Sequence, residues 1–400
     1  MINVSVLGYG TIGSGVVEVI NTNNKKLKET SGEEIKVKYV LDLREFEGNP
    51  VQKILVHDYS IIANDPEVDI VVEAMGGVHP AYDFVKEALE KGKSVCTSNK
   101  ELVAAHGAEL LEVAKAHNVN FFFEASVGGG IPIIRPLNEC ITADEIEEIT
   151  GILNGTTNYI LTKMSKEGAG FEETLKDAQD KGYAERNPEA DVEGHDACRK
   201  IAILTSLACG KQVNYEDIYT EGITKISDVD FKYAGSIGAS VKLFGTSKKV
   251  GDEIYAMVSP VMINETNPLY SVSDVFNAVL VKGNMLGNTM FYGAGAGKLP
   301  TASAVVSDVV QAVRHAGETV ETRWSKEPVK LGEMGQLVNR FFVRVAEGDK
   351  AKAQSLFANA TEVKADVAGE YAFITEAMKE EEFSKKAEEI NVINRIRVAF

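Results

Sequence analysis

The stretch that decides the fold is Gly8-Tyr9-Gly10-Thr11-Ile12-Gly13, close to the start of the chain. It follows a hydrophobic run at residues 2–7 and leads into a helical pattern that begins near Gly13. Gly8 permits a tight turn, Gly10 lets a pyrophosphate approach the backbone, and Gly13 allows the helix to pack closely on the strand. The N-terminus of that helix would face the phosphate charge. The motif therefore predicts a dinucleotide-binding loop, with cofactor contacts from Gly8, Gly10, Thr11, Ile12 and Gly13.

The strand-helix alternation continues through the first 125 residues. Short runs rich in β-branched residues alternate with helical patterns, of which the clearest are at residues 80–91 and 100–117. Such repeated order predicts an α/β domain of the Rossmann type, with a doubly wound parallel sheet. The expected strands are at residues 2–7, 35–41, 69–74, 94–97 and 120–124.

Two residues near the end of the second strand bear on the choice of cofactor. Asp42 stands where an acid commonly accepts hydrogen bonds from the adenosine ribose of NAD. Arg44 could instead hold the 2′-phosphate of NADP, or it could be a solvated loop charge. The sequence leaves NAD or NADP open, although Asp42 favours NAD.

Composition and charge exclude several classes of protein. The chain has 400 residues, of which 44% are hydrophobic, and a formal net charge of −17. It is long enough for two or three domains. Its acidity disfavours nucleic acid and anionic membranes as partners, and no segment reaches the roughly 20 apolar residues of a membrane span. The N-terminus lacks a basic, cleavable leader pattern, so we expect a cytoplasmic protein. Four separated cysteines predict reduced thiols and no zinc site: Cys96, Cys140, Cys198 and Cys209.

The rest of the chain changes pattern twice. Residues 139–290 read as an α+β domain, with a helix expected at residues 195–208 and strands at 255–261 and 278–282. A helix at 301–314 is expected to return to the first domain, and the polar segment 317–328 around Trp324 reads as a linker. We expect domains at 1–130 with 295–316 returning, 131–294, and 330–400.

The C-terminal segment has its own order of elements. Strands are expected at 340–345, 362–367, 371–375 and 394–400, and helices at 349–357 and 380–389. This β-α-β-β-α-β order predicts a ferredoxin-like domain.

Two polar clusters are harder to explain as structure alone. Thr97-Ser98-Asn99-Lys100 follows a buried strand, at the sheet edge that borders the ligand crevice in doubly wound folds. Ser98 and Lys100 are therefore candidate cofactor or substrate contacts, or they simply open the next helix. The second cluster, residues 182–200, is an acidic loop that leads into a helix. Asp196 and Lys200, four residues apart, share a helix face and can pair, which by itself is typical of a surface salt bridge.

Seven motifs occur in the order found in homoserine dehydrogenases, and the chain resembles this family over residues 1–315. The motifs are Gly-Tyr-Gly-Thr-Ile-Gly at 8–13, Val-Val-Glu-Ala-Met-Gly-Gly at 71–77, Thr-Ser-Asn-Lys at 97–100, Phe-Glu-Ala-Ser-Val-Gly-Gly-Gly-Ile-Pro at 123–132, Gly-Ile-Leu-Asn-Gly-Thr-Thr-Asn-Tyr at 151–159, the cluster at 185–200, and Gly-Ala-Gly-Ala-Gly-Lys-Leu-Pro-Thr at 293–301.

The resemblance implies NAD(P)-dependent interconversion of L-homoserine and L-aspartate 4-semialdehyde, in threonine and methionine biosynthesis. It implies that Lys200 is the proton donor, that Lys100 lies at the nicotinamide and substrate, and that Glu185 binds the substrate's amino group. It also implies supporting roles for Asp191 and Asp196, and a cofactor contact at Gly297. We expect a homodimer or homotetramer.

The reaction chemistry agrees with these roles. Hydride delivery to an aldehyde carbon creates a developing alkoxide, which needs a nearby cation and a proton. The ammonium of Lys200 supplies both, and in the oxidative direction the same lysine must be neutral. We hypothesise that the charge of Lys100 offsets that of the nearby acids. The turn at Asn154, Gly155 and Thr156, followed by Thr157, offers backbone N–H groups to the substrate carboxylate, or is only a structural turn.

The resemblance also implies a cation site. Glu124, Val127, Gly129 and Ile131 match a loop that holds sodium through main-chain carbonyls in some relatives. Neutral carbonyl oxygens suit a hard cation better than a transition metal.

Residues 335–400 resemble a shortened ACT domain, an amino-acid-sensing module. The usual Asp-x-Pro-Gly ligand loop is missing, and Val-Ala-Glu-Gly-Asp-Lys stands there at 345–350. We expect this ACT-like domain to mediate subunit contacts through its sheet edge rather than to bind threonine.

Two competing interpretations are less favoured. Aspartate-semialdehyde dehydrogenase requires a thiolate nucleophile, and only Cys198 has a histidine nearby in sequence, His195. A catalytically inactive nucleotide sensor is disfavoured because Lys100, Glu185 and Lys200 are all intact, together with Asp196.

Overall fold

The computed structural model describes residues 1–400. Contacts divide the chain into two compact units, each assembled from three segments. The first unit comprises Met1–Asp144, Ala202–Tyr215 and Gly293–Val329, and the second comprises Glu145–Ile201, Glu216–Tyr292 and Lys330–Phe400. The three-domain division expected from the sequence stays a prediction.

The first unit is built on a six-stranded sheet with the order β3-β2-β1-β4-β5-β6. All five strand pairs are parallel, so the doubly wound sheet is confirmed. The sequence missed the two-residue strand β3, which is too short to show a pattern. The strands are β1 (Ile2–Leu7), β2 (Ile35–Leu41), β3 (Leu55–Val56), β4 (Ile70–Glu73), β5 (Ser94–Thr97) and β6 (Phe121–Phe122).

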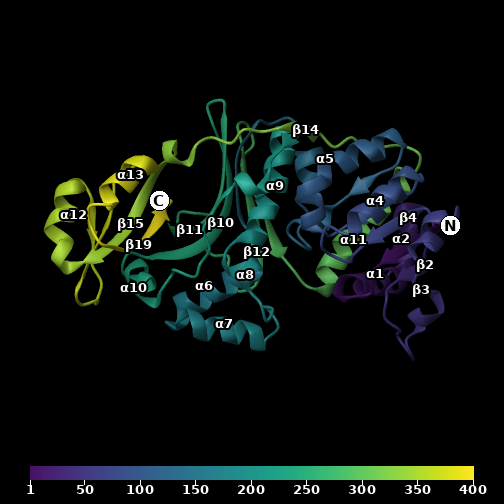
Figure 1. The fold of residues 1–400 in the computed structure, drawn as a ribbon, viewed down its shortest axis with the longest axis horizontal. Helices are drawn as coiled ribbons and strands as arrows, with labels where there is room; N and C mark the ends of the chain where they lie inside the picture. The colour runs from purple at the N-terminus through teal and green to yellow at the C-terminus, as the bar shows by residue number, and fades with distance from the viewer. The chain divides into compact units, whose positions relative to one another are not determined.

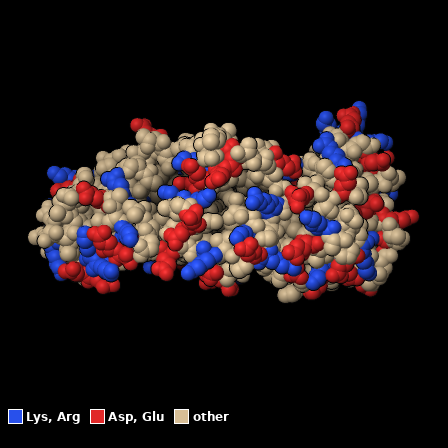
Figure 2. All heavy atoms as spheres, turned by 90° about the horizontal axis from the view of Figure 1, so that it is seen from above, with Lys and Arg blue, Asp and Glu red and all other residues tan.

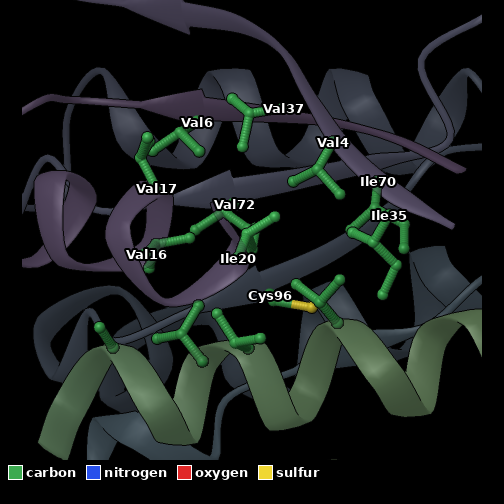
Figure 3. Packing of buried hydrophobic residues seen from close by; sticks show 14 of the residues in the cluster. Val4, Val6, Val16, Val17, Ile20, Ile35, Val37, Ile70, Val72 and Cys96 are labelled. Carbon is green, nitrogen blue, oxygen red and sulfur yellow. The ribbon is translucent and has the colours of Figure 1, made fainter. Parts of the chain in front are cut away.

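The core of this unit lies between the sheet and helices α1 and α11. Valines and isoleucines of β1, β2 and β4 face Val16 and Ile20 of α1, and α11 packs against the same cluster (Figure 3). The parallel strands are apolar on both faces because helices cover both. The helices of the unit are α1 (Thr11–Thr22), α2 (Asn24–Ser31), α3 (Tyr59–Asn64), α4 (Ala81–Glu90), α5 (Lys100–Ala116) and α11 (Lys298–Arg314).

The segment expected to be a linker is packed instead. The Trp324 ring is buried against Gly107 of α5, and its Nε1 donates a hydrogen bond to Gln212 Oε1 at 3.0 Å. Strand β14 (Ser325–Pro328) pairs with β8 (Lys211–Gln212). The linker prediction is wrong here because a single large apolar ring anchors an otherwise polar stretch.

The second unit contains most of an eleven-stranded sheet, whose main order is β13-β12-β7-β10-β11-β19-β15-β17-β16. The long hairpin β10–β11 forms its middle (Figure 1). The central strands are β7 (Ile146–Ile152), β9 (Tyr219–Thr220), β10 (Ala239–Val250), β11 (Glu253–Asn264), β12 (Phe276–Gly283) and β13 (Gly287–Ala294). The helices are α6 (Gly155–Glu167), α7 (Phe171–Asp180), α8 (Glu189–Val192), α9 (His195–Cys209) and α10 (Asp228–Ser236), and the unit boundary falls within α9.

The C-terminal elements have the predicted β-α-β-β-α-β order. They are β15 (Val338–Ala346), α12 (Lys350–Leu356), β16 (Thr361–Val363), β17 (Glu370–Ile374), α13 (Glu380–Ala387) and β19 (Val392–Val398), with the short strand β18 (Met378–Lys379) beside β15. The strands form the antiparallel order β19-β15-β17-β16, which is the ferredoxin-like topology. One edge is already occupied, because β19 pairs in parallel with β11. Whether these elements form an ACT-like domain stays a prediction.

Acidic and basic side chains are interspersed on the face drawn in Figure 2. All four cysteines are free, and Cys96 and Cys198 are buried. None of the helices combines the length and apolar character that crossing a membrane would require.

Candidate functional site

The glycine loop of the first unit is shaped as the motif predicts. Gly8 has a φ of +92°, and a Cβ there would lie 3.0 Å from the Ala74 carbonyl oxygen. A Cβ on Gly13 would lie 1.9 Å from the Gly8 carbonyl oxygen, whereas Gly10 has open space around it. Helix α1 starts at Thr11 without a side-chain cap. The loop therefore presents a helix N-terminus beside an open glycine, which is the geometry that accommodates a phosphate.

A cavity of about 410 Å³ opens beside this loop. Its volume is typical of small-molecule sites. It lies at the carboxyl ends of β1, β2 and β4, where ligands bind in doubly wound sheets. Tyr59 and Phe84 stack with their centroids 4.1 Å apart and form part of its wall. The remaining lining residues are Gly8, Gly10, Leu41, Asp42, Leu43, Arg44, His57, Ala74, Met75 and Pro80.

Asp42 is held in this cavity by charged and backbone donors. Arg44 donates from Nε to Oδ1 at 2.9 Å and from Nη2 to Oδ2 at 2.8 Å, and Tyr9 N–H donates to Oδ2 at 2.8 Å. The Arg44 guanidinium holds the pKa of Asp42 well below its ordinary value. The carboxylate is therefore ionised throughout the physiological range.

His57 also lines the cavity, although it was not predicted from the sequence. Its Nδ1 lies 2.6 Å from the Asp42 carbonyl oxygen, and its Nε2 lies 2.9 Å from Glu45 Oε1. These two oxygens raise the pKa of His57, the carbonyl contributing most. No sequence signal pointed to His57, because it comes from the distant strand β3 and its loop.

The polar cluster after β5 is fixed by hydrogen bonds. Thr97 Oγ1 donates to the buried Glu73 at 2.6 Å and accepts from Asn99 N–H at 2.9 Å. Asn99 caps α5 by accepting from Leu102 N–H at 3.1 Å. Thr97 and Asn99 are buried, whereas Ser98 and Lys100 are partly exposed. Glu73 is a buried acid at the end of β4, and an acid at the end of an apolar strand is the sequence signal that could have identified it.

In the second unit, Lys200 is the centre of a buried polar group. Its Nζ donates to Asp196 Oδ2 and to the Leu153 carbonyl oxygen, each at 2.7 Å. Asn154 Nδ2 donates to Asp196 Oδ2 at 2.9 Å and to Asp191 Oδ1 at 2.7 Å. The predicted pair of Asp196 and Lys200 is therefore present, and it is buried rather than at the surface. The role of the Leu153 carbonyl could not be inferred from the sequence.

Asn154 also begins helix α6. Its Oδ1 accepts from Thr157 N–H at 2.8 Å, which is an N-cap interaction. Thr156 Oγ1 donates to the Tyr183 carbonyl oxygen at 2.6 Å, and a Cβ on Gly155 would lie 2.8 Å from the Val275 carbonyl oxygen. This turn thus has a structural role, and its expected contact with a substrate carboxylate stays a prediction.

Glu185 also belongs to the second unit. Its side chain is exposed on the loop before α8, and its carbonyl oxygen accepts from Gln179 Nε2 at 3.1 Å. Asp191, in α8, is joined to Asn154 as described.

The loop expected to bind sodium lies in the first unit. Glu124 Oε1 accepts from Ile133 N–H at 2.6 Å and Ile134 N–H at 2.7 Å, and its Oε2 accepts from Arg135 N–H at 2.8 Å. The side-chain oxygens of Glu124 are thus hydrogen-bonded to backbone N–H groups. The carbonyl-only sodium site expected from Glu124, Val127, Gly129 and Ile131 stays a prediction. The structure contains no group of three or more His, Cys, Asp or Glu residues able to hold a metal ion.

Two further residues shape the same region. Asp308 accepts from Glu124 N–H at 2.9 Å and from Arg135 Nη2 at 3.0 Å, and burial raises the pKa of Asp308 to about 7. Gly297, the expected cofactor contact, begins α11 with a φ of +118° that favours glycine.

Two of the four cysteines, Cys96 and Cys198, are poor candidates for a nucleophile. Burial raises the pKa of the Cys198 thiol, and it raises the pKa of the fully buried Cys96 thiol further. A thiolate of the kind that aspartate-semialdehyde dehydrogenase requires is therefore disfavoured at both positions.

Comparisons with known proteins agree with this geometry. The family model described as "Homoserine dehydrogenase" matches residues 132–310, and the one described as "Homoserine dehydrogenase, NAD binding domain" matches residues 8–124. The curated homoserine dehydrogenase of Bacillus subtilis (strain 168) is 44% identical over 317 residues, which are 78% of this chain and 73% of that protein. The one from Helicobacter pylori is 44% identical over 351 residues, 87% of this chain and 82% of that protein.

Solved structures extend the similarity to the whole chain. A homoserine dehydrogenase from Thiobacillus denitrificans is 35% identical with a TM-score of 0.91, covering 100% of this chain and 98% of that one. A hyperthermophilic archaeal homoserine dehydrogenase in complex with NADPH is 28% identical with a TM-score of 0.67, covering 78% of this chain and 97% of that one.

Proposed function

Because the chain belongs to the homoserine dehydrogenase family of NAD(P)-dependent oxidoreductases, we propose that Lys200 exchanges the substrate proton as L-homoserine and L-aspartate 4-semialdehyde interconvert. The observation that carries this proposal is the buried ammonium of Lys200, oriented by Asp196 and the Leu153 carbonyl. A cation placed beside the reacting oxygen stabilises the alkoxide and can give it a proton.

A dinucleotide held at the glycine loop would supply the hydride in reduction and accept it in oxidation. The remaining work falls to the chain's own residues. In the reductive direction Lys200 gives a proton to the oxygen of the aldehyde, and in the oxidative direction its neutral amine takes the hydroxyl proton. Asp196, anchored by Asn154, orients the lysine and balances its charge when it is protonated.

We assign the remaining substrate contacts by charge. The ammonium of homoserine needs an acid, and Glu185 is an exposed carboxylate on the loop before α8. Asp191, held by Asn154, supports that loop. The start of α6 at Gly155 and Thr156 offers backbone donors to the substrate carboxylate, which suits the positive end of a helix.

Ser98 and Lys100 are proposed to contact the nicotinamide half of the cofactor and the substrate. They follow β5 at the carboxyl edge of the parallel sheet, and the hydrogen bonds of Thr97 and Asn99 fix the loop that carries them.

For the cofactor, we propose a preference for NAD over NADP. The ionised Asp42 faces the cavity beside the glycine loop, where it can accept from a ribose hydroxyl and repel a 2′-phosphate. Arg44 is engaged by Asp42 and would have to leave it to hold that phosphate. Gly297 at the start of α11 is proposed as a further contact.

We also propose that sodium binds through the carbonyl oxygens of Glu124, Val127, Gly129 and Ile131. A bound cation would brace the loop between Glu124 and Arg135. Its test needs no turnover: sodium chloride should raise the thermal unfolding midpoint above that in choline chloride of equal ionic strength, because binding stabilises the folded state.

The chain is proposed to act as a homodimer or homotetramer in the cytoplasm. Since β11 occupies one edge of the C-terminal sheet, the ACT-like domain would make subunit contacts through its other edge, strand β16. Light scattering after size-exclusion chromatography measures this state directly.

One assay tests the reaction and the cofactor choice together. Initial rates of L-homoserine oxidation are measured with NAD and with NADP at equal concentration. We expect turnover with both and a higher kcat/KM with NAD. If neither NAD nor NADP supports turnover, the proposed role of Lys200 is contradicted.

A further inference from the structure

A cavity of about 160 Å³ lies on one face of the sheet in the second unit. Its floor is apolar and consists of Phe244 from β10, Met257 and Val261 from β11, and Leu280 from β12. Residues near the start and end of the C-terminal elements, among them Leu337 and Val398, close its other side. Neither Lys200 nor Asp196 lines it, so it is separate from the lysine site.

An acid and a base stand side by side in the wall of this cavity. Glu148 of β7 and Lys248 of β10 are directly opposite each other in the antiparallel ladder. Lys248 Nζ lies 4.0 Å from Glu148 Oε2, and both side chains are partly exposed. The buried Thr150 donates to Glu148 Oε1 at 2.8 Å and so fixes the carboxylate. A loosely paired acid and base beside an apolar floor suit a zwitterion that carries an apolar group.

The volume limits the size of that ligand. A cavity of about 150 Å³ is known to accommodate a molecule as large as benzene. The space is too small for a nucleotide or a folded peptide, since sites for larger ligands start at roughly 300 Å³. An α-amino acid with a short apolar side chain has the matching groups. Its ammonium would meet Glu148, its carboxylate Lys248, and its side chain Phe244 and Leu280.

Strand β7 connects this cavity to the lysine site. Glu148 and Thr150 line the cavity, and the same strand ends two residues later at Ile152. The next residue is Leu153, whose carbonyl oxygen accepts from Lys200 Nζ, and then Asn154, which holds Asp196. A ligand that shifts β7 would therefore move both groups that orient Lys200.

We propose that this cavity binds a small α-amino acid with an apolar side chain, and that the bound amino acid alters turnover at Lys200 through β7. The binding half follows from the cavity alone. The regulatory half rests on the proposed function of Lys200.

Isothermal titration of the full chain tests the binding half. The probes are L-leucine and L-methionine, each compared with its D-enantiomer. We expect saturable binding of at least one L-probe, and a loss of affinity of about tenfold or more in Glu148→Gln and in Lys248→Gln. Glu147→Gln and Lys249→Gln are matched controls, because they are the neighbouring residues on the same strands and do not line the cavity.

Absence of saturable binding at millimolar probe, or binding that the two cavity variants leave unchanged, would overturn the proposal. A change in molecular mass on sedimentation of Glu148→Gln would overturn it as well, since this face would then be an interface between two copies. Titration heats do not depend on turnover, so an inactive enzyme would contradict the function of Lys200 without touching this result. If the probe binds but homoserine oxidation rates do not change, the coupling through β7 is wrong.

Discussion

The Nζ of Lys200 lies 2.7 Å from Oδ2 of Asp196, one turn earlier on α9, and both side chains are buried. Burying two charges costs more than their attraction returns unless the geometry and the extra hydrogen bonds are good. Here Asn154 and the Leu153 carbonyl supply those bonds. A charged group kept inside the protein with this much support is a candidate for chemistry rather than for stability.

Replacing Lys200 by Ala is expected to lower kcat for homoserine oxidation by roughly 10²- to 10⁴-fold, because proton transfer loses its positioned group. Dinucleotide affinity, measured by fluorescence titration, should stay within about twofold, since the nucleotide loop belongs to the other unit. Lys176→Ala, an exposed lysine on α7, is the control. A Lys200→Ala enzyme with near wild-type kcat would refute the assignment.

Asp196→Asn is expected to reduce the free energy of unfolding by about 3 to 5 kcal/mol, because it removes the buried carboxylate that pairs with the Lys200 ammonium. Asp228→Asn removes an acid with the same four-residue spacing from Lys232, but that pair is exposed. The control should cost no more than about 1 kcal/mol. Urea denaturation measures both, and equal losses would show that burial of the pair does not matter.

Asp42→Asn is expected to shift the ratio of kcat/KM for NAD to that for NADP towards NADP by about tenfold, or about 1.4 kcal/mol. The substitution removes the carboxylate that would repel the 2′-phosphate and frees Arg44 to bind it. Glu47→Gln is the control, because Glu47 is an exposed acid five residues after Asp42 and does not line the cavity. An unchanged ratio in Asp42→Asn would contradict the proposed preference.

Lys242 predicts an unusual dependence of stability on pH. Its Nζ is buried beside the Val272 carbonyl oxygen, and burial lowers the pKa of Lys242 to about 8. Below pH 8 the folded protein bears the whole cost of the buried charge. Between pH 8 and the ordinary lysine pKa of 10.5 the unfolded chain holds a proton that the folded state has released, so stability rises with pH.

Lys242→Met should remove this contribution, which is at most about 3 kcal/mol. Urea denaturation at about pH 7 and about pH 10 should therefore give a stability difference between wild type and variant that shrinks as the pH rises. Lys232→Met, at an exposed lysine, should show no such trend. A difference that stays constant with pH would mean that Lys242 titrates normally.

Replacing glycine by alanine is expected to change the stability of the protein in opposite directions at Gly107 and at Gly235. Alanine normally stabilises a helix by about 1 kcal/mol relative to glycine. At Gly235 in α10 nothing lies within 4 Å of the new Cβ, so Gly235→Ala should stabilise. At Gly107 in α5 the Cβ would lie 2.7 Å from the Trp324 ring, so Gly107→Ala should cost about 1 to 3 kcal/mol. Trp324 is the chain's single tryptophan, and its fluorescence reports the transition. Stabilisation by Gly107→Ala would show that the ring moves freely.

Features that depend on residues close together in the chain could be predicted from the sequence. The run at residues 2–7, the glycine spacing at 8–13 and the alternation that follows specify a doubly wound sheet, because strand and helix periods and turn geometry are local properties. The same holds for Asp196 and Lys200, whose spacing of four places them on one helix face. The C-terminal β-α-β-β-α-β order was also recognisable from local patterns.

Contacts between distant segments were decided only by the tertiary structure. Packing brings Asn154 to Asp196, 42 residues away, and turns an ordinary-looking surface pair into a buried one. It commits the Glu124 carboxylate to residues 133–135, buries Trp324 in a segment that reads as a linker, and joins β19 to β11. Such contacts depend on which surfaces remain to be covered once the elements have formed. No local pattern carries that information, because burial is a property of the assembled chain.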